Sequence, residues 1–230
     1  MSAELFLIQL SHISFSYRLF FFLIENYSLL VIAILIGKMI EPGNTILDKK
    51  DRKWVISTLI CNTLITALGF ELYQLGVIRI DFSNNLFSII IDAILLILIM
   101  DFCMFCFHYL AHSLKMLHRI HNLHHTHVST NIYSLFVLHP IETLGFGIIW
   151  LCLISLFEFN YIGLIVYLFL NLMYGILGHL KKNIFPESWS ENVVTKWISD
   201  TKFHNDHHQN EAHNFGFYFT YWDKIFKTII

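Results

Sequence analysis

Histidine is the residue type in this sequence whose spacing points most clearly to chemistry. All of the 14 histidines except His12 lie between His108 and His213. His108 and His112 are four residues apart, a spacing that places both rings on one face of a helix. Two later segments share the pattern HxxHH, and together they contribute His121, His124, His125, His204, His207 and His208.

The chemistry of these three clusters is metal binding. Neutral imidazole is a ligand for iron, zinc, copper and nickel, and it leaves a redox metal able to change its oxidation state. A tetrahedral zinc ion needs only four ligands, whereas the clusters offer eight imidazoles. The sequence therefore predicts two metal ions. An isolated histidine such as His12 is more simply a polar residue near the membrane surface.

Asp101 is a further candidate, because it precedes His108 by seven residues, or two helical turns. It should therefore project from the same helix face as His108. A carboxylate in that place could orient a ligating imidazole, or it could be a packing residue between helices. The sequence leaves both interpretations open.

The helices that position these residues are expected to lie in a membrane. The chain has 230 residues, of which 56% are hydrophobic and 14% charged, against roughly 45–50% and about 25% in a soluble domain. Three runs are long enough to cross a bilayer as helices: Leu19–Ile40, Trp54–Ile78 and Leu86–Leu110. A fourth apolar region, Ile141–Leu177, is interrupted at residues 158–160, which predicts a helical hairpin. The expected fold is an all-α integral membrane protein.

Basic residues predict how the helices are oriented, because short cytoplasmic loops carry excess Lys and Arg. If loop 41–53 is cytoplasmic, all of the lysines and arginines except Arg18 and Arg79 fall on that side. The histidine clusters fall there too, in a cytosolic helical cap. The expected location is a bacterial inner membrane or the endoplasmic reticulum.

Two further expectations concern organisation and partners. Residues 1–85 are expected to be transmembrane anchor helices and residues 86–230 the histidine-rich catalytic region, within one structural domain. The net charge of −2 provides no basic surface for nucleic acid.

These motifs, in this order and spacing, resemble the fatty acid hydroxylase and sterol desaturase superfamily of membrane di-iron enzymes. The similar segments are DFCMFCFHYLAH (101–112), LHRIHNLHH (117–125), HPIE (139–142), GH (178–179), FHNDHH (203–208) and NFGFYFTYWDKIFKT (214–228). The resemblance implies that the eight clustered histidines are metal ligands and that His179 is a ninth. His139 is a weaker candidate, as a ligand or a polar residue near the site.

The chain also departs from the family pattern at three positions. Tyr109 stands where the family usually has arginine, His118 where it often has tryptophan, and Lys227 where glycine is common. The first departure puts local electrostatics and substrate choice in question, and none of the three removes a ligand. His118, His127 and His213 match no ligand position, and we interpret them as bystanders or as residues supporting the ligands.

The resemblance implies that two iron ions and O2 hydroxylate or desaturate a C–H bond of a lipid-like substrate, such as a sterol or fatty acyl chain. Zinc is an alternative occupant of the same ligands in purified protein. Electrons must come from a separate ferredoxin, cytochrome or reductase, because the chain has no Rossmann, P-loop or haem-domain signature. The alternative is a metal-binding membrane protein or transporter without oxygenase activity. A transporter needs polar ligands near the bilayer midplane, whereas these histidines lie on one side.

Overall fold

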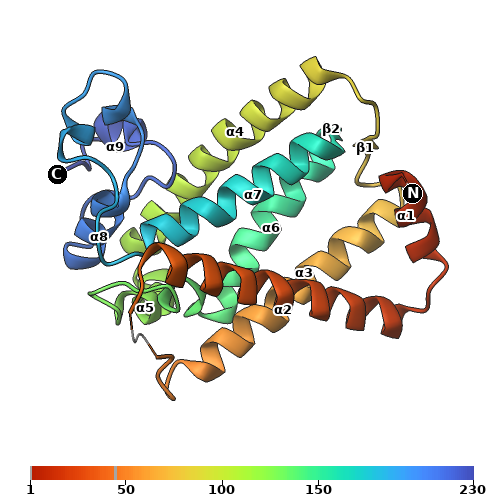
Figure 1. Ribbon diagram of the computed structural model, residues 1–230, viewed down its shortest axis with the longest axis horizontal. Helices are drawn as coiled ribbons and strands as arrows, with labels where there is room; N and C mark the ends of the chain where they lie inside the picture. Colours follow the sequence, from red (N-terminus) through yellow and green to blue (C-terminus); the bar gives the residue numbers. More distant parts are fainter. Residues whose placement is uncertain (1, 44–45) are drawn as a thin grey trace.

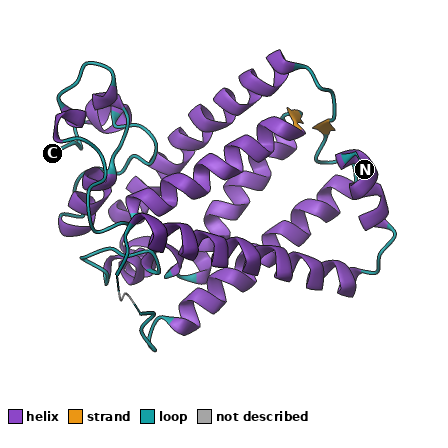
Figure 2. Cartoon of the chain, viewed as in Figure 1, coloured by secondary structure: helices purple, strands orange, loops and turns teal. Residues whose placement is uncertain are grey.

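The computed structural model describes residues 2–43 and 46–230, and helices dominate this part of the chain (Figures 1 and 2). Its α-helices are α1 (Ala3–Ser11), α2 (Phe15–Ile40), α3 (Arg52–Gln74), α4 (Leu86–Ser113), α5 (Lys115–His125), α6 (Pro140–Leu156), α7 (Tyr161–Gly178), α8 (Thr201–Gln209) and α9 (Tyr221–Phe226). The remaining elements are two short strands, β1 (Ile80–Asp81) and β2 (Phe159–Asn160), and the 3-10 turns η1 (Ser134–Phe136), η2 (Glu187–Ser190) and η3 (Thr195–Trp197). Residues 44–45 of the predicted cytoplasmic loop lie outside the described part.

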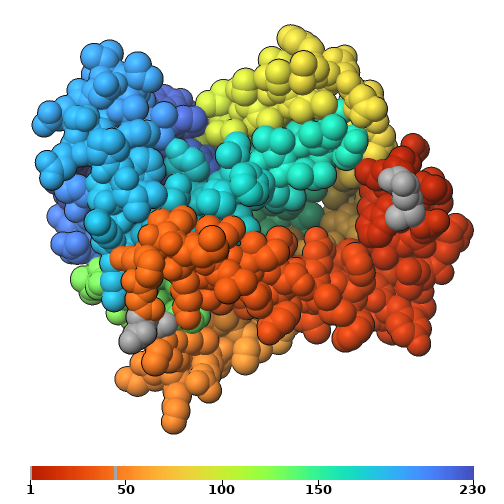
Figure 3. All heavy atoms as spheres, in the orientation of Figure 1, coloured from red at the N-terminus to blue at the C-terminus, as the bar shows by residue number. Residues whose placement is uncertain are grey.

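Four helices, α2, α3, α4 and α7, are long and apolar enough to cross a membrane, and α6 is a shorter apolar helix. This confirms the predicted all-α membrane fold. The three predicted runs fall in α2, α3 and α4, and the predicted hairpin supplies the fourth long helix, α7. Many apolar side chains on α2 face outward, including Phe20 at 61% exposure and Leu35 at 55%, as expected for a surface in contact with lipid. Figure 3 shows α2 lying across one face of the molecule.

Helix α3 ends at Gln74, four residues before the predicted Ile78. Gly76 adopts a positive φ of 71°, and the N–H of Val77 donates to the carbonyl of Leu72. This is a Schellman ending, which stops a helix where glycine can take the left-handed conformation. At the other end of the bundle, α4 continues to Ser113 and so carries both His108 and His112 on helical backbone.

The predicted hairpin is present, with α6 and α7 as its arms and its break at residues 157–160. Asn160 begins α7, because its side-chain oxygen accepts from the N–H of Ile162 at 2.9 Å. Asp92 of α4 accepts from the N–H of Asn160 at 2.7 Å, and Ile80 of β1 pairs in parallel with Phe159 of β2. The turn between α6 and α7 is therefore held by a hydrogen bond to α4 and by the pairing of β2 with β1, which precedes α4.

Packing brings α3 against α2 and α6, and α4 against α7. Leu96, Met100, Ile154 and Tyr167 are among the buried side chains of the main apolar core between these helices. The short helices α5, α8 and α9 form a cap at the end of the bundle opposite the two strands (Figure 1). Helices α4 and α7 both end at this cap, so they deliver their last residues to it.

Candidate metal centre

The structure gathers the nine predicted ligands into two groups at the junction of the bundle and the cap. The five-histidine group contains His108, His112, His121, His125 and His207. The four-histidine group contains His124, His179, His204 and His208. Within each group, one ring nitrogen from every histidine lies within 4.8 Å of all the others. Each group is therefore compact enough to hold a metal ion.

Both HxxHH clusters are divided between the groups. Helix α5 gives His121 and His125, four residues apart, to the five-histidine group, whereas His124 projects toward the other group. Helix α8 gives His207 to the five-histidine group and His204 and His208 to the four-histidine group. Because α5 and α8 each contribute to both groups, the two sites share one pair of helices.

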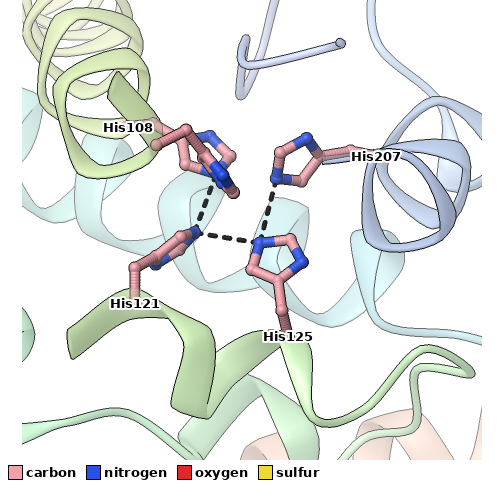
Figure 4. A group of neighbouring side chains, drawn as sticks. His108, His121, His125 and His207 are labelled. Atoms are coloured by element: carbon pink, nitrogen blue, oxygen red, sulfur yellow. Dashed lines mark hydrogen bonds between the residues drawn. The ribbon is translucent and has the colours of Figure 1, made fainter. Parts of the chain in front are cut away.

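The Nε2 atoms of the five-histidine group converge, as Figure 4 shows for four of its members. The distances are 3.1 Å between His108 and His121, 3.0 Å between His121 and His125, and 3.1 Å between His125 and His207. A metal–nitrogen bond of about 2.1 Å places two ligands at right angles about 3.0 Å apart. The observed separations match the spacing expected for neighbouring ligands on one ion.

Backbone carbonyls determine which nitrogen of two of these rings carries the proton. His108 Nδ1 lies 2.9 Å from the carbonyl oxygen of Phe215, and His207 Nδ1 lies 2.6 Å from that of His213. A carbonyl can only accept, so both Nδ1 atoms must donate. The Nε2 lone pairs of His108 and His207 therefore face the interior of the group.

His179 is held in the same way in the four-histidine group. Its Nδ1 lies 2.9 Å from the hydroxyl oxygen of Ser134, whose own hydrogen is donated to the carbonyl of Asn131 at 2.7 Å. The hydroxyl must accept from His179, so the Nε2 lone pair points toward His204 Nε2 at 3.3 Å. The Nε2 lone pair of His179 is thus directed into the four-histidine group, as a metal ligand requires.

Glu142 supports His121, and no sequence pattern predicted this role. Its Oε1 atom lies 2.6 Å from His121 Nδ1, and both side chains are buried. A carboxylate in this position accepts the Nδ1 proton and increases the basicity of Nε2. The only sequence signal was the HPIE element, which contains Glu142 but does not indicate its partner.

His139, from the same element, belongs to neither group. Its Nδ1 accepts from the N–H of Ile141 at 3.2 Å, so the ring caps the start of α6. The cap positions the first turn of α6, which carries Glu142. His139 therefore lies near the site without facing either group.

Asp101 lies in α4, fully buried, and contacts backbone rather than a histidine ring. Its Oδ1 accepts from the N–H of Tyr218 at 2.7 Å and from that of Phe219 at 3.3 Å. These residues follow Phe215, whose carbonyl holds His108. Asp101 is thus connected to His108 through the chain segment that it anchors, and not by the direct contact that the helical spacing suggested.

Burial lowers the pKa of the histidines that α5 and α8 contribute to the two groups. The pKa of His121 falls to about 4 and that of His124 to about 3, chiefly because desolvation disfavours the charged ring. Neighbouring imidazoles add to the effect at His204 and His208, whose pKa values also lie well below the usual range. These rings are neutral at pH 7 and can bind a metal without first losing a proton.

A small cavity of about 20 Å³ adjoins the four-histidine group. His179, His204, Tyr174 and Phe217 are among the residues that line it. Such a volume holds a molecule of roughly the size of water. The four-histidine group therefore has room beside it for a molecule of about that size.

The remaining histidines of the region lie outside both groups, and they contact acidic residues or contribute backbone. His118 Nε2 lies 3.1 Å from Glu211, in the loop after α8, and His127 Nε2 lies 3.3 Å from Asp51. His213 supplies the carbonyl that holds His207. The sequence did not indicate a role for Glu211, because no motif contains it.

Comparison with known proteins gives one match. The sequence model of the fatty acid hydroxylase family matches residues 93–228, more than half of the chain, from within α4 to just beyond α9. All nine histidines of the two groups lie in the matched segment. No curated protein and no solved structure matches the chain.

Proposed function

Since the chain belongs to the fatty acid hydroxylase family, we propose that it is a membrane-bound di-iron oxygenase that hydroxylates or desaturates a C–H bond of a lipid substrate. The observation that carries this proposal is the convergence of nine imidazoles into two adjacent groups, with the Nε2 lone pairs of His108, His207 and His179 directed inward. Two iron ions, when bound there with O2 and external electrons, would supply the oxidising chemistry that an unactivated C–H bond requires.

The residues of the chain hold and orient such a centre. The five-histidine and four-histidine groups would each take one ion, and nitrogen donors suit iron as well as zinc. The carbonyl of Phe215, the carboxylate of Glu142 and the hydroxyl of Ser134 keep the Nδ1 atoms engaged, so the Nε2 atoms stay directed inward. These contacts fix the ligands before any metal arrives.

The position of the groups supports a lipid substrate. They lie where α4 and α7 leave the apolar bundle, so an acyl or sterol chain between the helices could reach them from the membrane. The cavity at His179 and His204 leaves room for a small molecule beside the four-histidine group. We propose that the cap faces the cytoplasm, where a separate ferredoxin, cytochrome or reductase would deliver electrons.

Lipid analysis tests this function directly. Cells that express the chain with iron and a reductant system should accumulate a lipid that has gained one oxygen atom or lost two hydrogen atoms. His124→Ala, which removes a proposed ligand, should abolish that product, whereas His12→Ala should not change it. A chain that binds two ions but leaves the lipid profile unchanged in every donor system would instead be a metal-binding protein without oxygenase activity.

A further inference from the structure

Glu211 reaches rings from two different helices at the edge of the five-histidine group. It lies in the loop that follows α8, and its side chain is 36% exposed. Its Oε2 atom is 3.7 Å from His112 Nδ1 of α4 and 3.1 Å from His118 Nε2 of α5. Its Oε1 atom is 3.7 Å from His125 Nδ1 of α5. One carboxylate therefore adjoins two of the proposed ligands.

Each of these two ligands presents its outer nitrogen to Glu211. The Nε2 atom of His125 points inward, where it lies 3.0 Å from His121 and 3.1 Å from His207. The Nδ1 atom of His125 is fully buried and has no hydrogen-bond partner within bonding distance in the part of the chain that the structure describes. The Nε2 atom of His112, the ring nitrogen that does not face Glu211, is buried and has no hydrogen-bond partner among the described residues. Glu211 places a carboxylate oxygen 3.7 Å from the Nδ1 atom of each of these two rings.

With Glu211 included, every ring of the five-histidine group has an acceptor facing its Nδ1 atom. His108 and His207 have backbone carbonyls, and His121 has Glu142. His112 and His125 have Glu211. All five rings are thereby directed to present Nε2 to the same point. The negative charge of Glu211 also partly balances the positive charge of a metal ion that only neutral imidazoles hold.

We propose that Glu211 is a positioning residue of the five-histidine site, which holds the Nδ1 protons of His112 and His125 and so strengthens the binding of one of the two metal ions. This inference rests on the two-metal site proposed above. His118, which stands where the family often has tryptophan, contacts the same carboxylate from the exposed side and helps to orient it.

Titration with cobalt(II) tests the proposal on the full chain in detergent, after removal of metal and with a competing chelator present. The unmodified chain should take up two ions. Glu211→Gln should weaken one of the two binding events by roughly ten- to a hundred-fold and leave the other unchanged, because only one group contacts the residue. Glu187→Gln, an exposed glutamate of η2, provides the matched control and should change neither event.

Chemical rescue separates positioning from a general structural role. Because Glu211 is partly exposed, acetate should enter the space left by Glu211→Ala and recover much of the lost affinity. The proposal would be overturned if Glu211→Gln left both binding events unchanged or weakened both of them equally. It would also be overturned if neither Glu211→Gln nor Glu211→Ala folded. A third binding event that His118→Ala removes would also overturn it, since Glu211 would then be a ligand of a separate ion. If the unmodified chain failed to take up two ions, the proposed function would fail instead.

Discussion

Replacing Asp101 should destabilise the fold while leaving the metal site of the surviving protein intact. Asp101 Oδ1 accepts the backbone N–H groups of Tyr218 and Phe219, at 2.7 and 3.3 Å, in a fully buried place. A second carboxylate, that of Asp223, holds the backbone just before Tyr218. It accepts hydrogen bonds from the N–H groups of Phe215 and Gly216, both at 2.8 Å. The carbonyl that supports His108 therefore keeps one anchor when Asp101 is removed.

The size of the effect follows from the two N–H groups. In Asp101→Ala both lose their acceptor, and a buried unpaired donor costs about 1–3 kcal/mol, so the free energy of unfolding should fall by about 2–6 kcal/mol. That is a large part of a typical total of about 5–15 kcal/mol. Asp101→Asn keeps an oxygen acceptor but loses its charge, which should cost about 1 kcal/mol per hydrogen bond.

Thermal unfolding in detergent and metal content per folded chain should be measured together. Both Asp101 variants should melt at lower temperature, the alanine variant more so, with full metal content in the folded fraction. Asp92→Ala is the matched control at the other end of α4, because Asp92 also accepts one backbone N–H, that of Asn160. It should lose less stability and no metal. Normal melting of Asp101→Asn with metal affinity reduced ten-fold or more would refute this reasoning and indicate a direct effect on the ligands.

Four other predictions can be checked separately. Metal analysis of the iron-loaded chain should give two ions, and Mössbauer spectra should show them coupled; a single tetrahedral ion would contradict the assignment. Glu142→Gln should weaken metal binding by roughly ten- to a hundred-fold in competition with a chelator, because His121 Nδ1 loses its carboxylate acceptor. Cysteines introduced at positions 115 and 182 should be labelled from the same side of the membrane, as the basic-residue bias predicts; labelling from opposite sides would refute the topology. Finally, burial lowers the pKa of His121 to about 4 and that of His124 to about 3, from an ordinary value of 6.5. Below pH 6.5 the unfolded chain therefore takes up protons that the folded chain does not, which favours unfolding. The metal-free protein should melt at a lower temperature at pH 5 than at pH 7.

Local sequence was sufficient to predict the long helices and most of the candidate ligands. Hydrophobic runs of about 20 residues have few other stable states than membrane helices, because their backbone polar groups must pair internally. The predicted hairpin break at residues 158–160 coincides with the β2 segment and the start of α7. Helical periodicity likewise placed His108 beside His112, and His121 beside both His124 and His125.

The tertiary structure decided how these ligands are shared and what holds them. A spacing of HxxHH shows which rings lie on one helix face, but it does not show that His124 turns to a different site from His121 and His125. The partners of the outer nitrogens come from distant parts of the chain: Phe215 is 107 residues from His108, and Glu142 is 21 residues from His121. Helix geometry is fixed by neighbours within a few residues, whereas these partners depend on how the cap packs against the bundle. For that reason eight of the nine histidines could be found from their spacing and His179 from the family resemblance, while the contacts of Glu142, Glu211 and Asp101 required the fold.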